Sequence, residues 1–165
     1  MRRAQNWTVT ADPSAVAPAR HRALAHARAW GYIFDDIQAQ MFELLVSEMV
    51  TNAVLYGQTD STDDPHVSIG IQGHPEGVLI IVRDRSHEGP SYTADPYADE
   101  HGWGVTIMQR LALDYGWLPL VEGKAVWAVM GAERSRSREQ WRIVAVLGRI
   151  RALRPQIRVH ASALP

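Results

Sequence analysis

The fold is decided by residues 44–57, LLVSEMVTNAVLYG. They form the second half of a predicted helix that follows a pair of aspartates, either of which can cap its free amides, and that stops at Gly57. The helix is apolar almost all round, yet it carries Glu48 and Asn52 four residues apart, so both side chains lie on one face, one turn from each other. Burying a carboxylate there is unfavourable unless it is paired. The pattern therefore indicates either a functional pair or a glutamate that reaches solvent or a nearby arginine.

Seven further elements are predicted around this helix from residue propensity and hydrophobic periodicity. Strands are expected over residues 6–10, 66–72, 78–83, 117–121 and 125–130, and helices over residues 15–30 and 102–115. A long aperiodic connection, rich in acidic residues, separates the third strand from the last helix, and connections of this length are often functional. This order predicts an α+β fold, a two-layer α/β sandwich in which helices cover one face of a mixed, mostly antiparallel sheet.

Two other segments carry residue types that suit a nucleotide. Asp84 ends a buried strand, where its carboxylate can accept a hydrogen bond from an exocyclic amine such as that of adenine. Gly102-Trp103-Gly104 stands directly before a predicted helix, whose free amides and positive dipole end favour a phosphate, and glycines let the backbone approach closely. Taken singly, each pattern is also typical of ordinary structure, because aspartate initiates turns and a glycine pair can simply open a helix.

Together, and in this order, the segments resemble the anti-sigma-factor serine/threonine kinases of the histidine-kinase-like ATPase superfamily, which share the Bergerat fold. The resemblance covers roughly residues 5–131. LVSEMVTNAVLYG is similar to their N box and HGWGVTIMQRLALDYGW to their second glycine box, and these two motifs are specific. VLIIVRDRS is similar to the strand and first glycine box, and GKAVWAVM to the closing strand.

The resemblance implies a role for individual residues. Glu48 would act as the general base toward a substrate serine and Asn52 would bind Mg²⁺, which suits a phosphoryl transfer. Asp84 would read the adenine of ATP, while Gly102 and Gly104 would hold the phosphates. The other residues expected to line the nucleotide site are Ser86, His101, Trp103, Val105 and Ala125.

The same resemblance implies a regulatory function. The expected protein binds ATP or ADP with Mg²⁺, sequesters a sigma factor, and phosphorylates an anti-anti-sigma protein that antagonises this sequestration. Three departures from the kinase pattern support an alternative, a non-catalytic partner-binding regulator with a degenerate ATP site, which either binds a nucleotide or is nucleotide-free. Ser86 stands where the first glycine box has glycine, Ala125 stands where the closing strand often has threonine, and residues 87–100 contain no lysine or arginine.

The distribution of charge divides the chain into an ATP-binding domain at residues 1–131 and a basic extension at residues 132–165. The first part holds 9 basic and 16 acidic side chains, whereas the second holds 8 arginines and 2 glutamates. The extension is predicted to form an amphipathic helix with an apolar stripe and arginines on a neighbouring face. The stripe consists of Ile143, Leu147, Ile150 and Leu153, and the arginines are Arg138, Arg142 and Arg149. It can pack on its own acidic domain, bind a partner or form a homodimer, or contact a membrane surface or nucleic acid.

Composition limits the remaining possibilities. A chain of 165 residues suits one such domain with a sizeable core. It has no cysteine, which excludes disulfides and thiolate metal sites, and its histidines are too scattered to suggest zinc. No stretch approaches the ~20 apolar residues of a membrane span, and the start of the chain lacks the apolar run of a signal peptide. We therefore expect a cytoplasmic protein without direct nucleic-acid contacts.

Overall fold

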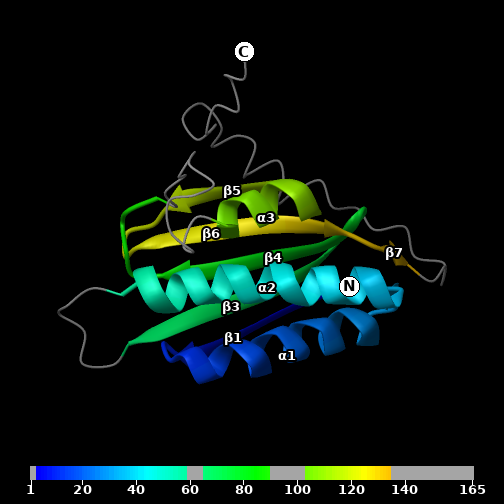
Figure 1. The fold of residues 1–165 in the computed structure, drawn as a ribbon, viewed down its shortest axis with the longest axis horizontal. Coiled ribbons are helices and arrows are strands. Elements are labelled where there is room, and N and C mark those ends of the chain that lie inside the picture. Colours follow the sequence, from blue (N-terminus) through cyan, green and yellow to red (C-terminus); the bar gives the residue numbers. More distant parts are fainter. Residues whose placement is uncertain (1–2, 59–64, 90–102, 135–165) are drawn as a thin grey trace, which may run out of the picture.

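A five-stranded sheet forms the base of the molecule in the computed structural model, which describes residues 3–58, 65–89 and 103–134 (Figure 1). Its strands are, in spatial order, β1 (Ala4–Thr10), β3 (His66–His74), β4 (Gly77–Asp84), β6 (Lys124–Gly131) and β5 (Ala112–Pro119). The sheet was expected to be mostly antiparallel, and every pairing between these neighbours is antiparallel.

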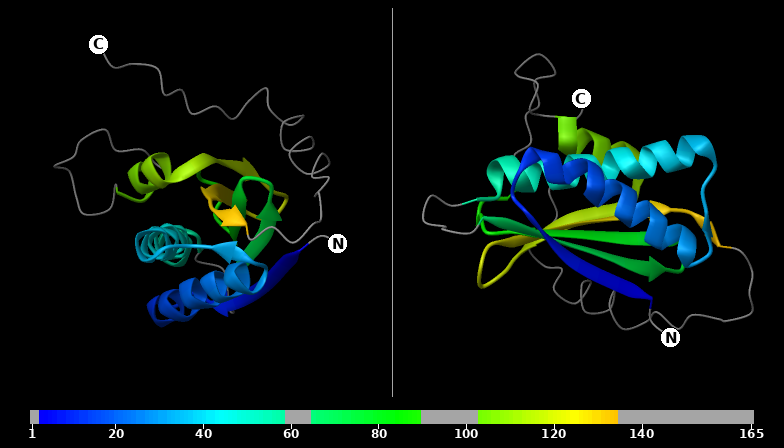
Figure 2. Two further views of the ribbon diagram at one scale, coloured as in Figure 1. Left: turned by 90° about the vertical axis from the view of Figure 1, so that its right-hand side faces the viewer. Right: turned by 90° about the horizontal axis from the view of Figure 1, so that it is seen from below.

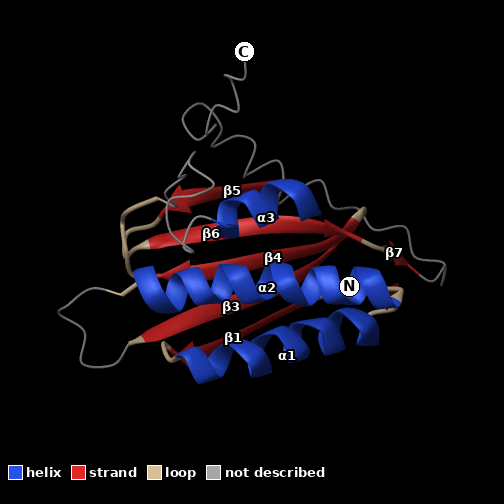
Figure 3. Ribbon diagram, viewed as in Figure 1, coloured by secondary structure: helices blue, strands red, loops and turns tan. Residues whose placement is uncertain are grey.

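Three helices lie on one face of this sheet, which confirms the predicted α+β sandwich of two layers (Figure 2). They are α1 (Val16–Ala29), α2 (Asp36–Tyr56) and α3 (Trp103–Leu111), and a short 3-10 turn, η1 (Pro13–Ala15), precedes α1. The helix α2 packs on β3 and β4 and contacts α1 and α3 on its two sides (Figure 3). The main hydrophobic core lies between the helices and the sheet.

Capping and burial explain why α2 forms where the sequence predicted it. The Asp35 side chain accepts a hydrogen bond from the Gln38 amide at 2.7 Å, and the Gln38 side chain accepts one from the Asp35 amide at 3.1 Å, which closes a capping box. At the other end, the Gly57 amide donates to the Ala53 carbonyl. The buried side chains are Ala39, Phe42, Leu45, Val46, Met49, Val50, Ala53 and Val54. The exposed ones include Ile37, Met41, Leu44 and Leu55, so the helix has a solvent face although its sequence is apolar almost all round.

The strand β4 is buried on both faces, which explains its uninterrupted apolar sequence. Val78 and Ile80 belong to the main core beneath the helices. Leu79, whose side chain alternates with theirs, packs with Trp127 and Val129 of β6 on the opposite face. Toward its end the second face opens, because Arg83 is exposed, whereas Asp84 on the helix-covered face is buried.

The helix predicted over residues 102–115 is shorter than expected. In the structure α3 ends at Leu111, and β5 begins at Ala112. The prediction was wrong because β5 finds backbone hydrogen-bonding partners along β6, and such tertiary pairing overrides helix propensity. A shift in register between Ala112 and Asp114 marks the change from helix to strand, and Leu113 between them is exposed.

A small second sheet was not predicted from the sequence. It consists of β2 (Tyr32–Ile33) and β7 (Glu133–Arg134), which pair in antiparallel fashion. Two residues per strand are too few to produce a periodic pattern. The Tyr32 hydroxyl donates a hydrogen bond to the His74 carbonyl at 2.9 Å, which ties this sheet to the turn between β3 and β4.

Several predicted features lie outside the described residues. They are the polar loop at 59–64, most of the connection that follows Asp84, His101, Gly102 and the basic extension from residue 135 onward. Among the helices that the structure does describe, none is both long and apolar enough to cross a membrane.

His74 is a buried titratable side chain at the end of β3, with 7% of its surface exposed. Its Nδ1 accepts a hydrogen bond from the Glu76 amide at 3.2 Å, and its Nε2 is buried without a partner in the described part of the chain. Burial lowers the pKa of His74 below its usual value, against the opposite influence of the Glu76 and Asp114 carboxylates. The folded chain therefore keeps His74 neutral at a pH where the unfolded chain begins to protonate it.

We expect His74 to make the fold less stable in acid. The loss of unfolding free energy due to His74 is absent above the unfolded-state pKa of about 6.5. It grows as the pH falls toward the lower folded-state pKa, by at most ~1.4 kcal/mol per pH unit. Urea unfolding between about pH 7.5 and pH 5.5 measures this slope. The variant His74→Asn keeps an acceptor for the Glu76 amide but does not titrate, so its stability should change less over the same range. An equal decline in both proteins would contradict the assignment.

Candidate functional site

The last turn of α2 and the end of β4 meet at Gly57. The Gly57 carbonyl accepts hydrogen bonds from the backbone amides of Arg85 at 2.8 Å and Ser86 at 3.0 Å. A Cβ atom at Gly57 would lie 2.6 Å from the Cγ of Asp84, so only glycine permits this approach. The contact fixes the helix that carries the predicted base and metal ligand against the strand end that carries the predicted adenine-reading carboxylate.

Glu48 is half-buried on α2 and has no hydrogen bond or ion pair with any residue that the structure describes. It differs in this from Glu43 of the same helix, whose carboxylate lies 2.9 Å from the Nδ1 of His21. Burial raises the pKa of the Glu48 carboxyl above its usual value. A carboxylate that is partly dehydrated and not held by another side chain can take a proton from a bound hydroxyl group, and a raised pKa makes it a stronger base.

Asn52 follows Glu48 by one helical turn and is half-buried as well. Its neighbours Val50 and Ala53 are buried in the core, whereas Glu48 and Asn52 are both partly exposed. An amide oxygen is a suitable ligand for Mg²⁺, which takes few protein ligands and completes its coordination with phosphate oxygens and water. The spacing thus places a carboxylate and an amide on one helix face, where the sequence predicted a base and a metal ligand.

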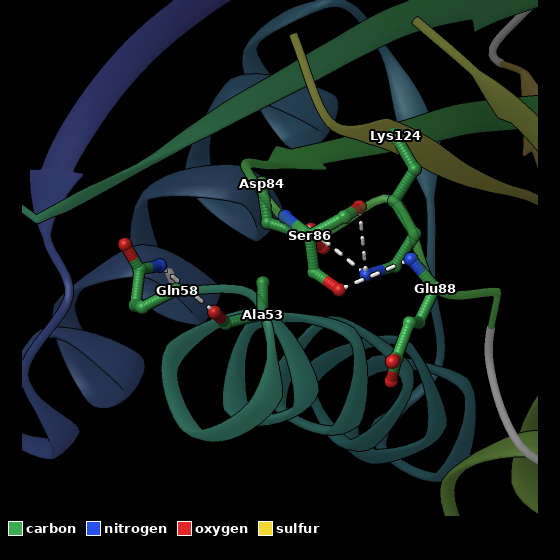
Figure 4. A network of polar contacts seen from close by, with 6 residues as sticks. All are labelled: Ala53, Gln58, Asp84, Ser86, Glu88 and Lys124. Carbon is green, nitrogen blue, oxygen red and sulfur yellow. Dashed lines mark hydrogen bonds and ion pairs between the residues drawn. The ribbon is translucent and has the colours of Figure 1, made fainter. Parts of the chain in front are cut away.

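The carboxylate of Asp84 is already paired within the chain. Lys124, which lies opposite Asp84 in the register of β4 and β6, donates from Nζ to Asp84 Oδ1 at 2.8 Å (Figure 4). The side chains of Asp84 and Lys124 are only 2% and 8% exposed. Burial raises the pKa of Asp84, although the hydrogen bond from Lys124 acts in the opposite direction. The group predicted to read adenine therefore faces an ammonium group of the protein itself.

Ser86, which replaces the glycine of the kinase pattern, is integrated into the same network (Figure 4). Its amide donates to Asp84 Oδ1 at 3.0 Å, and its hydroxyl oxygen accepts a hydrogen bond from the Glu88 amide at 3.2 Å. Its carbonyl receives a second, longer contact from Lys124 Nζ at 3.5 Å. The turn after β4 is thus held both to α2 and to the start of β6.

The structure brings part of the predicted site together. Glu48 and Asn52 lie on α2, and Asp84 and Ser86 lie at the strand end that the last turn of α2 contacts. Ala125, expected at the adenine end, is buried in β6. Trp103, Gly104 and Val105 form the first turn of α3, whereas His101 and Gly102 lie outside the described residues.

Sequence reasoning missed Lys124. It assigned the relevant position of the closing strand to Ala125, and a shift of one residue exchanges the two faces of a strand. One signal could have identified it: Lys124 is the only lysine in the chain, and it directly precedes an apolar strand. A lysine buried at such a point requires a partner, and the carboxylate that ends the preceding buried strand can supply one.

The described residues fit a nucleotide with Mg²⁺ at one end of the site only. On α2, the Asn52 amide suits a metal ion that arrives with phosphates, and the Glu48 carboxylate, which has no partner among the described residues, suits a base toward a hydroxyl group. At the end of β4, the charges of Asp84 and Lys124 neutralise each other, and the two side chains expose almost no surface to a nucleobase. Within the described residues, no group of three or more acidic or histidine side chains could hold a metal ion. A metal at Asn52 would therefore depend on the phosphates of the nucleotide for further ligands.

Comparison with known proteins identifies the family of the domain. A family model for the histidine kinase-like ATPase domain matches residues 9–130, from β1 to the end of β6. The chain is also 35% identical over 75 residues to the anti-sigma F factor of Priestia megaterium, in a match that covers 40% of this chain and 50% of that protein. The chain thus spans about half the length of this curated relative. It belongs to the family of histidine kinase-like ATPase domains.

Proposed function

We propose that this chain is a regulator of the anti-sigma kinase kind, which binds ATP with Mg²⁺, phosphorylates a serine or threonine of an antagonist protein, and holds a sigma factor. The supporting observation is Glu48, a half-buried carboxylate without a partner among the described residues, one turn before Asn52. The name of the matched Priestia megaterium protein, an anti-sigma factor, supports the choice of partner.

The residues of α2 suit the chemistry of this transfer. The substrate hydroxyl loses its proton to Glu48 while its oxygen takes the γ-phosphoryl group, and ADP leaves. Such reactions depend chiefly on positioning and on neutralising the phosphate charge, with a carboxylate to receive the proton. Asn52 would hold the metal that supplies the neutralisation, and Glu48 would act at the hydroxyl.

Incubation with labelled ATP, Mg²⁺ and a cognate antagonist protein tests the proposal directly. We expect label on a serine or threonine of the antagonist, and capture of the sigma factor by the unmodified chain. The proposal fails if no label is transferred under conditions in which the chain binds ATP.

The variant Asn52→Ala should bind ATP at least about 10-fold more weakly in the presence of Mg²⁺, because a group that supports a bound metal is commonly worth that factor. Calorimetric titration with ATP measures the change. In excess chelator the difference between wild type and variant should disappear, because the amide acts through the metal. Gln40→Ala is a matched control, since it removes an exposed amide from the same helix.

A second candidate function is favoured by a separate observation, the closed pair of Asp84 and Lys124. In this version the chain holds its protein partner but transfers no phosphate. Capture of a sigma factor without any phosphoryl transfer, in the presence of saturating ATP, would support this version, and robust transfer to the antagonist would exclude it.

A further inference from the structure

We infer that Lys124 is an internal occupant of the nucleobase subsite: its ammonium group takes the hydrogen bond that Asp84 would otherwise accept from the amine of adenine, so the site opens to ATP only when Lys124 moves away. The inference rests on the proposed nucleotide site, and it concerns how that site is regulated.

The chemistry of the two donors is similar. The exocyclic amine of adenine offers N–H groups to a carboxylate, and so does an ammonium group, with the additional advantage of a charge. Lys124 Nζ lies 2.8 Å from Asp84 Oδ1, which is an ordinary distance for a charge-assisted hydrogen bond. Because the side chain of Asp84 is only 2% exposed, the adenine ring cannot reach its carboxylate while the lysine remains in place.

The backbone around Asp84 leaves the lysine side chain as the part that can move. On one side, a Cβ at Gly57 would lie 2.6 Å from Asp84 Cγ, and on the other, a Cβ at Gly123 would lie 2.6 Å from the Cα of Arg85. Hydrogen bonds from Arg85 and Ser86 to the Gly57 carbonyl hold the same turn. Lys124, by contrast, carries its ammonium group on a flexible four-carbon chain. Opening therefore requires a rotation of this side chain and no rearrangement of the strand.

The inference predicts an effect of unusual sign. A lysine near a triphosphate would normally assist binding through its charge, so its removal would weaken binding. If Lys124 instead occupies the adenine position, its removal strengthens the binding of ATP. The gain should be specific to the base, because guanine presents a carbonyl oxygen at the position of the adenine amine, and two acceptors do not pair.

Three variants of the full chain test this by calorimetric titration with ATP and GTP in Mg²⁺. Lys124→Thr removes the ammonium group and should bind ATP about 10- to 100-fold more tightly than wild type, which corresponds to one hydrogen bond to a charged group. Lys124→Arg keeps a cationic donor and should bind like wild type. Arg83→Thr is the matched control, because it removes one positive charge from an exposed position next to Asp84 and should change nothing. None of the variants should gain affinity for GTP.

The possible outcomes separate this inference from the proposed function. If wild type and Lys124→Thr bind ATP equally well, the nucleotide site stands and the internal occupant is wrong. If Lys124→Thr binds more weakly than wild type, the lysine contacts the nucleotide instead of excluding it, which also overturns the inference. If none of the proteins binds ATP, both the inference and the proposed nucleotide site fail.

A measurement on the unmodified chain decides the question even if Lys124→Thr does not fold. Because Lys124 is the only lysine, labelling with ¹⁵N-lysine gives a single side-chain ammonium signal in the NMR spectrum. We expect this signal to be protected from solvent exchange in the free protein, and to become that of a solvated lysine at saturating ATP and Mg²⁺. A solvated signal in the free protein, or a protected signal that persists with bound ATP, would overturn the inference.

Discussion

Glu48→Gln should slow phosphoryl transfer to the antagonist protein by about 100- to 10,000-fold, the usual contribution of a general base. Glutamine has nearly the same size and shape as glutamate, but its amide does not accept a proton at neutral pH. Glu48 has no partner among the described residues, so the change breaks no ion pair there. The affinity for ATP should remain close to that of wild type. Single-turnover transfer with labelled ATP and Mg²⁺ measures the rate of the chemical step.

The pH dependence of the same reaction should identify the group. Burial raises the pKa of Glu48 above its usual value, and a general base acts only in its deprotonated form, so the rate should fall as the pH decreases through that raised pKa. The acidic limb should therefore lie at a higher pH than a solvated glutamate would give, and it should be absent from Glu48→Gln.

The same pKa shift has a consequence for stability. An acid whose pKa is higher in the folded chain than in the unfolded chain destabilises the fold when it is ionised, and this penalty disappears as the pH falls and the group is protonated. At neutral pH the ionised Glu48 carries this penalty. Glu48→Gln should therefore unfold at the same or a higher urea concentration than wild type.

A control on the same helix separates the loss of the base from the loss of any carboxylate. Glu43 lies beside His21, whose side chain is 60% exposed while that of Glu43 is 25% exposed, and ion pairs that reach solvent contribute little to stability. Glu43→Gln should therefore leave the transfer rate unchanged. If Glu48→Gln transferred phosphate as fast as an active wild type, Glu48 would have no role as a base. If the wild type itself transferred no phosphate, the result would favour the second, non-catalytic function.

Those elements of the fold could be predicted whose sequence patterns lie within one short stretch of the chain. The helix α2 was predicted correctly because a capping aspartate, its apolar positions and its terminal glycine all lie within one stretch of sequence. The end of α3 was predicted wrongly because the first residues of β5, 112–115, are compatible with a helix, and their pairing with β6 makes them part of the strand. The pairing of β2 with β7 joins residues about a hundred positions apart, and no local pattern records it.

The candidate site divides in the same way. Glu48 and Asn52 could be placed on one face because helical geometry fixes their relation. The state of Asp84 could not be foreseen, because its partner Lys124 is forty residues away and reaches it through the register between β4 and β6. The sequence therefore predicted which residues resemble a nucleotide site, but the occupation of its carboxylate by the chain itself depends on the tertiary structure.

Gly123→Ala should destabilise the fold by about 2–5 kcal/mol. Gly123 has a φ of +86°, a conformation that costs other residues roughly 1–2 kcal/mol. A Cβ at this position would also lie 2.6 Å from Arg85 Cα and would overlap the carbonyl oxygen of Asp84, and such overpacking typically costs about 1–3 kcal/mol. Equilibrium unfolding in urea gives the loss directly.

Gly31→Ala provides a matched control for the second of these two contributions. Gly31 has the same φ of +86°, but nothing lies within 4 Å of the position where its Cβ would be built. The free energy of unfolding of Gly31→Ala should therefore fall only by the conformational contribution, about 1–2 kcal/mol. The difference between the two variants measures how tightly the turn before β6 is pressed against the backbone at Asp84. Equal losses would mean that this turn has room to yield, and opening of the site would then not depend on the Lys124 side chain alone.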